Sequence, residues 1–199
     1  MTKDFAGATF TLLGRPAAGK GVQSDLLKHF LEARGYRDII LLKIGSFFRK
    51  IQYEETVIGR WVKSSLTKGV LFPRWLAVNL FLEELRPALL RDDQIIIVDG
   101  FPRRLDEAKD LDDILDKLGR RPVVPIYLEI SEAEVRRRLV KRARSDQNEE
   151  AMTNRLTWFK TDVLPVLEYW EERLVTIDGL GTVEAVFQRM IKALDKIVS

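Results

Sequence analysis

The segment Gly14-Arg15-Pro16-Ala17-Ala18-Gly19-Lys20-Gly21 follows a short apolar run, Ala8–Leu13, and precedes a stretch with helical periodicity. Glycines let successive backbone N–H groups turn toward one anion, and the N-terminus of a helix adds the positive end of its dipole. Lys20 supplies a mobile positive charge for the outer phosphates of a nucleotide. The strict form of this pattern carries Ser or Thr after the lysine, where this chain has Gly21. We interpret the segment as a phosphate-binding loop.

The rest of the chain alternates between apolar runs and helical patterns. Five runs are mostly continuous, as in strands covered on both faces of a parallel sheet: Ala8–Leu13, Ile39–Leu42, Ile95–Val98, Val124–Ile130 and Leu174–Ile177. Helical patterns cover Gly21–Ala33, Leu76–Leu90, Leu105–Leu118, Ser131–Arg142, Glu149–Arg173 and Val183–Val198. Pro165 is expected either to kink the fifth of these or to start a part of it. This order predicts the α/β class, with a five-stranded parallel sheet between layers of helices.

Two segments interrupt the alternation. Residues 45–75 are helical in pattern but have no strand, so we expect a helical insertion that lies over the sheet. Residues 140–147 are short and polar, and they are a candidate lid. Residues 1–199 otherwise read as a single domain, for which the length of 199 residues is sufficient.

The composition excludes several classes of partner. The net charge of +3 is too small to indicate nucleic-acid binding, and no apolar run reaches the roughly 18 to 20 residues that span a bilayer. The absence of cysteine excludes disulfides and thiolate metal sites. The single histidine, His29, lies in a helical pattern and cannot form a histidine metal site alone. We expect a cytoplasmic protein.

A second motif, Asp99-Gly100-Phe101-Pro102-Arg103, follows the apolar run Ile95–Val98. An aspartate at the carboxyl end of a central strand is placed to hold the water of a magnesium ion near bound phosphates. The guanidinium of Arg103 can contact a phosphate with two N–H groups at once. The motif therefore predicts Mg²⁺ bound together with ATP.

Arginines are concentrated in the last third of the chain. Arg138 and Arg142 are one helical turn apart, and Arg144-Ser145-Asp146 and Arg155 follow. Phosphoryl transfer depends on stabilising charge on the transferred group more than on covalent chemistry. Several converging arginines would meet that need, and a solvated helix face is the alternative interpretation of such a run of charges.

Taken in this order, the three motifs resemble those of the adenylate kinase group of nucleoside monophosphate kinases. The resemblance runs from about residue 8 to residue 196. The loop of that group usually reads Gly-x-Pro-Gly-x-Gly-Lys-Gly-Thr, and this chain departs from it at Ala17 and Val22. Ala17 limits the backbone angles available to the loop, and Val22 removes a hydroxyl group near the phosphates.

The resemblance implies a three-layer P-loop kinase fold and a monomer that transfers the γ-phosphoryl group of ATP to a nucleoside monophosphate. On family grounds the acceptor is AMP. It places ATP against Gly14, Pro16, Ala17, Ala18, Gly19, Lys20, Gly21, Val22, Arg138 and Gly179. It assigns the acceptor to Gly45, Arg49, Phe72, Gly100, Arg103 and Glu107. It gives catalytic roles to Lys20, Arg103, Arg142, Arg144 and Arg155, and Asp99 would hold the metal through water. Residues 45–75 would bind the monophosphate.

The acceptor segment departs further from the family pattern. Ile44 and Ser46 stand where a threonine and an aspartate are usual, and Glu107 replaces a glutamine. An ionised glutamate only accepts hydrogen bonds, so it would oppose adenine N1 and suit the two donors of guanine. Glu107 can equally serve only the dipole at the start of its helix.

The sequence therefore leaves alternatives to AMP open. They are a guanine nucleotide, another phosphorylated metabolite, or an ATP-binding sensor without turnover. The retention of Lys20, Asp99 and the spaced arginines argues against the sensor.

Overall fold

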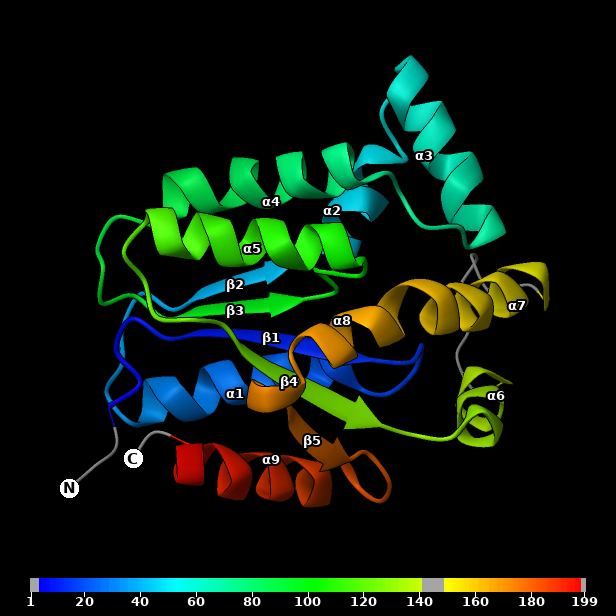
Figure 1. Cartoon of the computed structure of the whole chain (residues 1–199). Coiled ribbons are helices and arrows are strands. Elements are labelled where there is room, and N and C mark those ends of the chain that lie inside the picture. Colours follow the sequence, from blue (N-terminus) through cyan, green and yellow to red (C-terminus); the bar gives the residue numbers. More distant parts are fainter. Residues whose placement is uncertain (1–3, 141–148, 198–199) are drawn as a thin grey trace.

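The computed structural model describes residues 4–140 and 149–197. Its sheet has five strands, all parallel, in the order β2-β3-β1-β4-β5. They are β1 (Thr9–Gly14), β2 (Ile40–Lys43), β3 (Ile96–Asp99), β4 (Val124–Glu129) and β5 (Val175–Asp178). Helices cover both faces of this sheet, which gives three layers (Figure 1). The predicted fold class is confirmed.

The helices in the described residues fall near the predicted positions. They are α1 (Lys20–Ala33), α2 (Ile44–Ile51), α3 (Val57–Lys68), α4 (Arg74–Ala88), α5 (Leu105–Lys117), α6 (Glu132–Val140), α7 (Glu149–Trp158), α8 (Leu164–Tyr169) and α9 (Val183–Ile197). Helices α4 and α5 lie on one face of the sheet, and α1 and α9 lie on the other (Figure 1).

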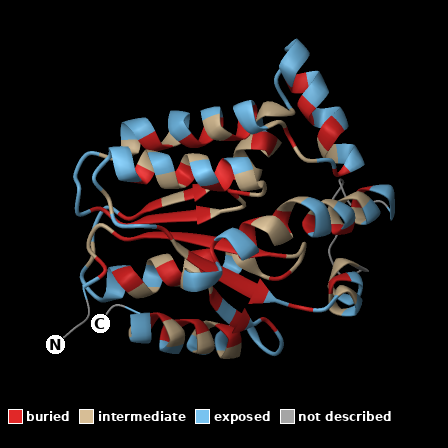
Figure 2. Cartoon of the chain, in the orientation of Figure 1, coloured by how far each residue is buried: buried red, intermediate tan, exposed pale blue. Residues whose placement is uncertain are grey.

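Strand β3 shows why the apolar runs are continuous. Ile96 and Val98 belong to the core beneath α4 and α5, whereas Ile95 and Ile97 belong to the core beneath α1 and α9. Successive side chains of a strand point to opposite faces, so a strand covered on both faces must be apolar at every position. Figure 2 shows the strands buried along almost their whole length.

The long helical pattern Glu149–Arg173 is divided in the structure. Helix α7 ends at Trp158, a π-helical turn covers Phe159–Val163, and α8 begins at Leu164 with Pro165 in its first turn. Proline has no N–H group to donate to the preceding turn, and π-helical segments occur mostly as single turns within α-helices. Pro165 therefore starts a new helix, which is one of the two outcomes expected from the sequence.

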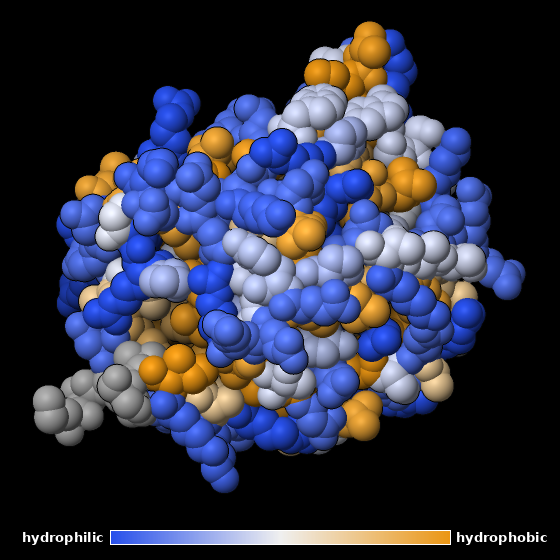
Figure 3. All heavy atoms as spheres, viewed as in Figure 1, coloured by the Kyte–Doolittle hydropathy of each residue, from blue (hydrophilic) through white to orange (hydrophobic). Residues whose placement is uncertain are grey.

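The helical insertion forms α2 and α3. Helix α3 projects from the body of the molecule (Figure 1). Thr56 caps it by accepting a hydrogen bond from Gly59 N–H at 2.9 Å. At its outer end the side chains of Val57 and Ile58 are exposed, and apolar atoms appear there on the surface (Figure 3). The monophosphate-binding role of residues 45–75 stays a prediction. The predicted lid, residues 140–147, lies almost wholly outside the described residues.

The loops that follow β1 and β3 meet at one edge of the sheet. The two strands pair in parallel with Leu12 opposite Asp99, so their carboxyl ends coincide. A hydrogen bond joins them, because Thr11 Oγ1 donates to the carbonyl oxygen of Phe101 at 2.6 Å.

Among the described residues, no helix is long and apolar enough to cross a membrane.

This bond can be tested by replacing Thr11 with valine, which keeps the shape of the side chain and removes the donor. Thr11 is fully buried, so the Phe101 carbonyl would lose its donor away from water. We expect the free energy of unfolding to fall by about 1–3 kcal/mol, as measured by urea denaturation.

Thr9→Val is the matched control in the same strand. Thr9 is equally buried, but its Oγ1 has no hydrogen-bond partner in the described part of the chain. Its replacement should leave stability unchanged or raise it. Equal losses in both variants would contradict the role given to the Thr11 bond.

Candidate active site

A cavity of about 200 Å³ lies at the carboxyl edge of the sheet. It is lined by the loop after β1, the start of α2, the segment after β3, the end of α3 and one side of α7. The predicted site residues that line it are Gly14, Pro16, Ala17, Gly19, Lys20, Gly21, Gly45, Arg49, Phe72, Asp99, Gly100, Arg103 and Arg155. The fold thus gathers residues from separate motifs into one cavity.

The loop after β1 curves through backbone angles that favour glycine. Gly14 and Gly19 have φ values of +146° and +99°, and Ala17 has a φ of +60°. Lys20 Nζ donates to the carbonyl oxygens of Gly14 at 2.7 Å and Arg15 at 2.9 Å. No side chain caps the N-terminus of α1, so this helix end is suited to an anion.

Asp99 lies directly beside the first turn of α1. A Cβ atom added to Gly21 would stand only 3.2 Å from Asp99 Oδ2. Within residues 4–140 and 149–197, no group of three or more histidine, cysteine, aspartate or glutamate side chains could hold a metal ion. A single carboxylate next to a phosphate loop suits Mg²⁺, which is usually held by water, substrate phosphates and one or two carboxylates.

Arg49 and Arg103 converge on the start of α2. A Cβ atom at Gly45 would lie 3.5 Å from Arg49 Nη1 and 3.7 Å from Arg103 Nη2. Arg103 Nε also donates to the carbonyl oxygen of Gly100 at 2.9 Å, and Arg49 Nη2 donates to Ser46 Oγ at 3.0 Å. Because Gly45 has no side chain, the two guanidinium groups beside it have space to bind a phosphate group between them.

The surroundings of Arg103 destabilise the positive charge of its guanidinium group. Burial lowers the pKa of its guanidinium, and the positive charges of Arg155 and Arg49 lower it further, against the opposite effect of Glu107 and Asp99. A bound anion would reduce this repulsion. The cavity therefore has the electrostatics of a phosphate site.

Glu107 and Ile44 do not line the cavity. Ile44 is 1% exposed and packs in the core beneath α4. Glu107 is 2% exposed, and its Oε2 accepts a hydrogen bond from Arg103 N–H at 2.7 Å. Burial raises the pKa of the Glu107 carboxyl from 4.5 to about 7, although Arg103 opposes this shift.

Four further predicted residues do not line the cavity: Ala18, Val22, Arg138 and Gly179. Ala18 is buried, whereas Val22 is 43% exposed. Arg138 donates to the carbonyl oxygens of Gly179 at 2.8 Å and Ala17 at 3.3 Å and pairs with Glu134. It therefore joins the phosphate loop to the turn after β5. Arg142 and Arg144 lie outside the described residues.

The sequence reasoning missed several residues of the lining, namely Leu66, Leu139, Trp158 and Val163. The ring of Trp158 lies 5.4 Å from the Arg103 guanidinium carbon. The helical spacing of three residues between Arg155 and Trp158 places both on one side of α7. From that spacing, the sequence could have predicted that Trp158 lies on the same side of the helix as Arg155.

Comparison with known proteins agrees with this site. The family model described as adenylate kinase matches residues 12–175 of the chain. The chain belongs to the adenylate kinase family. The adenylate kinase of a Thermus thermophilus strain is 35% identical over 194 residues, which cover 94% of this chain and 97% of that protein. The adenylate kinase of a Mycobacterium leprae strain is 34% identical over 185 residues, covering 93% and 98%. The predicted family and class of enzyme, an ATP-dependent nucleoside monophosphate kinase, are confirmed.

Ala17 stands where the adenylate kinase family usually has glycine, and its left-handed backbone gives a stability prediction. That conformation costs an L-residue about 1–2 kcal/mol, whereas glycine adopts it freely but loses more chain entropy on folding. We expect Ala17→Gly to raise the free energy of unfolding by about 1 kcal/mol and the melting temperature by about 2–4 °C. Calorimetry measures both.

Ala18→Gly is the control within the same loop. Ala18 is buried and is not among the non-glycine residues with a positive φ, so it should lose about 0.5–1 kcal/mol. Destabilisation by Ala17→Gly would show that the backbone of Ala17 is not strained.

Glu107→Gln restores the usual residue of the adenylate kinase family and gives a pH prediction. Between pH 4.5 and about 7, the native carboxyl holds a proton that the unfolded chain releases. The wild type should therefore lose stability as the pH rises through this window, by up to about 3 kcal/mol, and the loss should be complete above it. Glutamine does not titrate.

The measurement is urea denaturation of both proteins at pH 5, 6, 7 and 8. The stability of Glu107→Gln relative to the wild type should increase up to about pH 7 and then remain level. Stability curves that run parallel across the whole range would contradict a raised pKa.

Proposed function

We propose that this member of the adenylate kinase family catalyses ATP + AMP = 2 ADP, with residues of a single cavity holding both substrates. The observation that carries the proposal is the meeting of the Lys20 loop with Arg49, Arg103 and Arg155 in one cavity. A phosphate loop alone would suit many nucleotide-binding proteins. A second cationic site beside it suits an acceptor that is itself a phosphate.

The donor half is the loop from Gly14 to Gly21 with the N-terminus of α1. Its backbone N–H groups would surround the β-phosphate of ATP. Lys20, which contacts the loop carbonyls of Gly14 and Arg15, would turn toward the outer phosphates. Arg138 would support the nucleotide from the side, because it already joins the loop to Gly179.

The acceptor half is the start of α2 with the segment after β3. Arg49 and Arg103 would hold the α-phosphate of AMP above Gly45 and Gly100, with Phe72 beside the nucleotide. An acceptor phosphate oxygen is already anionic, so the reaction requires no general base. The transferred group would be stabilised chiefly by Lys20 and Arg155, since charge placement is the main requirement of phosphoryl transfer.

Three further elements complete the proposal. Asp99, beside Gly21, would hold Mg²⁺ through water, and the ion would shield the phosphate charges of ATP. Residues 45–75 would close over the acceptor, and residues 140–147, with Arg142 and Arg144, would form a short lid that excludes water. We further propose a monomer in a cytoplasmic setting, because the family resemblance implies a monomer and the nucleotide substrates suit that compartment.

The position of Glu107 removes the sequence argument for a guanine nucleotide as the acceptor. The guanine alternative needs this carboxylate at the acceptor base, but its Oε2 accepts from Arg103 N–H and the residue lies outside the cavity lining. The retained cationic groups, in turn, favour an enzyme over a sensor, since binding alone would not need the set around Arg103.

An ADP-release assay with AMP, GMP, CMP and UMP tests the proposal. We expect AMP to be the best acceptor, and Lys20→Ala to lower kcat by about 10²–10³-fold. Lys28→Ala on the same helix is the control, because Lys28 pairs with Glu32 on the surface and does not line the cavity. A faster reaction with GMP, or ATP binding without turnover of any acceptor, would refute the proposed function.

A further inference from the structure

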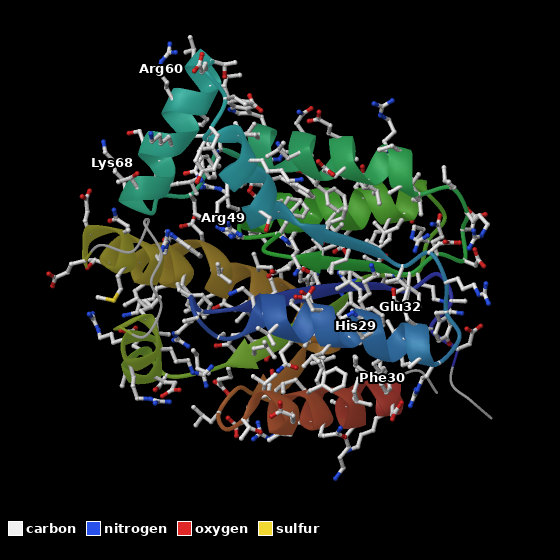
Figure 4. All side chains as sticks on the ribbon, turned by 180° about the vertical axis from the view of Figure 1, so that it is seen from behind. His29, Phe30, Glu32, Arg49, Arg60 and Lys68 are labelled. Atoms are coloured by element: carbon white, nitrogen blue, oxygen red, sulfur yellow. The ribbon has the colours of Figure 1, made fainter. Side chains whose placement is uncertain are left out.

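Helix α7 holds the carboxyl end of α3. Asn154 Nδ2 donates to the carbonyl oxygen of Lys68 at 2.7 Å, and Trp158 Nε1 donates to that of Gly69 at 3.0 Å. The last carbonyl groups of a helix have no partner within it, so α7 satisfies two groups that α3 leaves open. The end of α3 accordingly lies beside α7 in Figure 1, and Figure 4 labels Lys68 at this end.

The two backbones also touch. Gly69 has a φ of +66°, and a Cβ atom at this position would lie 2.5 Å from the carbonyl oxygen of Ala151. Ala151, Asn154 and Trp158 are spaced by three and four residues, so they occupy one face of α7. Three contacts along this face fix where α3 sits.

Trp158 also contacts the proposed acceptor site. The guanidinium carbon of Arg103 lies 5.4 Å from the centre of its ring, within range of a cation–π interaction. Arg155, one turn earlier on α7, lines the same cavity. Arg49 lies on the part of α2 that faces this region (Figure 4). Trp158 therefore contacts α3 through its N–H group and Arg103 through its ring.

We propose that Trp158 is a positioning residue that couples the seating of α3 on α7 to the placement of Arg103 at the acceptor phosphate. The inference rests on the proposed function of the cavity. The hydrogen bond to Gly69 holds the indole in one orientation, and the ring supports one face of the guanidinium. Arg103 Nε already donates to the Gly100 carbonyl. This hydrogen bond and the contact with the Trp158 ring together set the direction of the remaining N–H groups of the guanidinium.

This role predicts an effect on the acceptor and not on ATP. Trp158→Phe keeps an aromatic face and removes the donor, so we expect AMP to bind about 3- to 10-fold more weakly, a change of the size of one hydrogen bond. Trp158→Leu removes both features and should weaken AMP binding more. The dissociation constant for ATP should stay unchanged in both. Calorimetry of AMP and of ATP measures these constants without turnover.

Two comparisons separate positioning from a general structural role. Trp75→Phe is the matched control, because Trp75 is 61% exposed and does not line the cavity; it should bind AMP as the wild type does. In an Arg103→Lys background, Trp158→Leu should add little further loss of AMP affinity, since the residue acts through Arg103.

The outcomes distinguish the two proposals. Unchanged AMP affinity in both Trp158 variants, an equal loss for ATP, or the same loss with Arg103→Lys as without it would overturn the positioning role. Absence of turnover by the wild type would overturn the proposed function. The binding measurements would still decide whether Trp158 acts through Arg103.

Discussion

The parallel pairing of β1 with β3 is the contact on which the site depends. Because Leu12 lies opposite Asp99, the phosphate loop and the Asp99–Arg103 segment leave the sheet at the same edge. The bond from Thr11 to the Phe101 carbonyl holds the two segments together, and Gly21 permits Asp99 to approach α1. Donor and acceptor phosphates would thus meet where two strands end.

Arg103 is the central residue of the proposed acceptor site. Its backbone N–H donates to Glu107, its Nε donates to the Gly100 carbonyl, and its guanidinium carbon lies over the ring of Trp158. Burial and neighbouring positive charge lower its pKa, so the native structure maintains a repulsion that a phosphate would relieve. A site built in this way holds its charges in place before the substrate arrives, which is the requirement for electrostatic catalysis.

Several features that looked atypical in the sequence have separate structural explanations. Ile44 belongs to the core, where its apolar side chain is favourable. Glu107 is buried and accepts a hydrogen bond from the backbone N–H of Arg103, so it helps to fix the position of that residue. Ala17 keeps the left-handed backbone of the loop despite its Cβ atom. Val22, which is also atypical, is 43% exposed, so its side chain lies in contact with solvent.

The sequence alone was sufficient for the strands, for most helices and for the glycine-rich loop after β1. These features are set by local rules: apolar runs mark strands buried on both faces, and glycine spacing permits the turns of the loop. The family resemblance then identified Arg49, Arg103 and Arg155, and the structure brings them together in the cavity. The structure alone determined that Glu107 turns inward, that Arg138 joins the loop to Gly179, and that Trp158 links α3 with Arg103. Those contacts depend on which faces of distant elements meet, and the periodicity of one segment carries no information about the partner it will pack against.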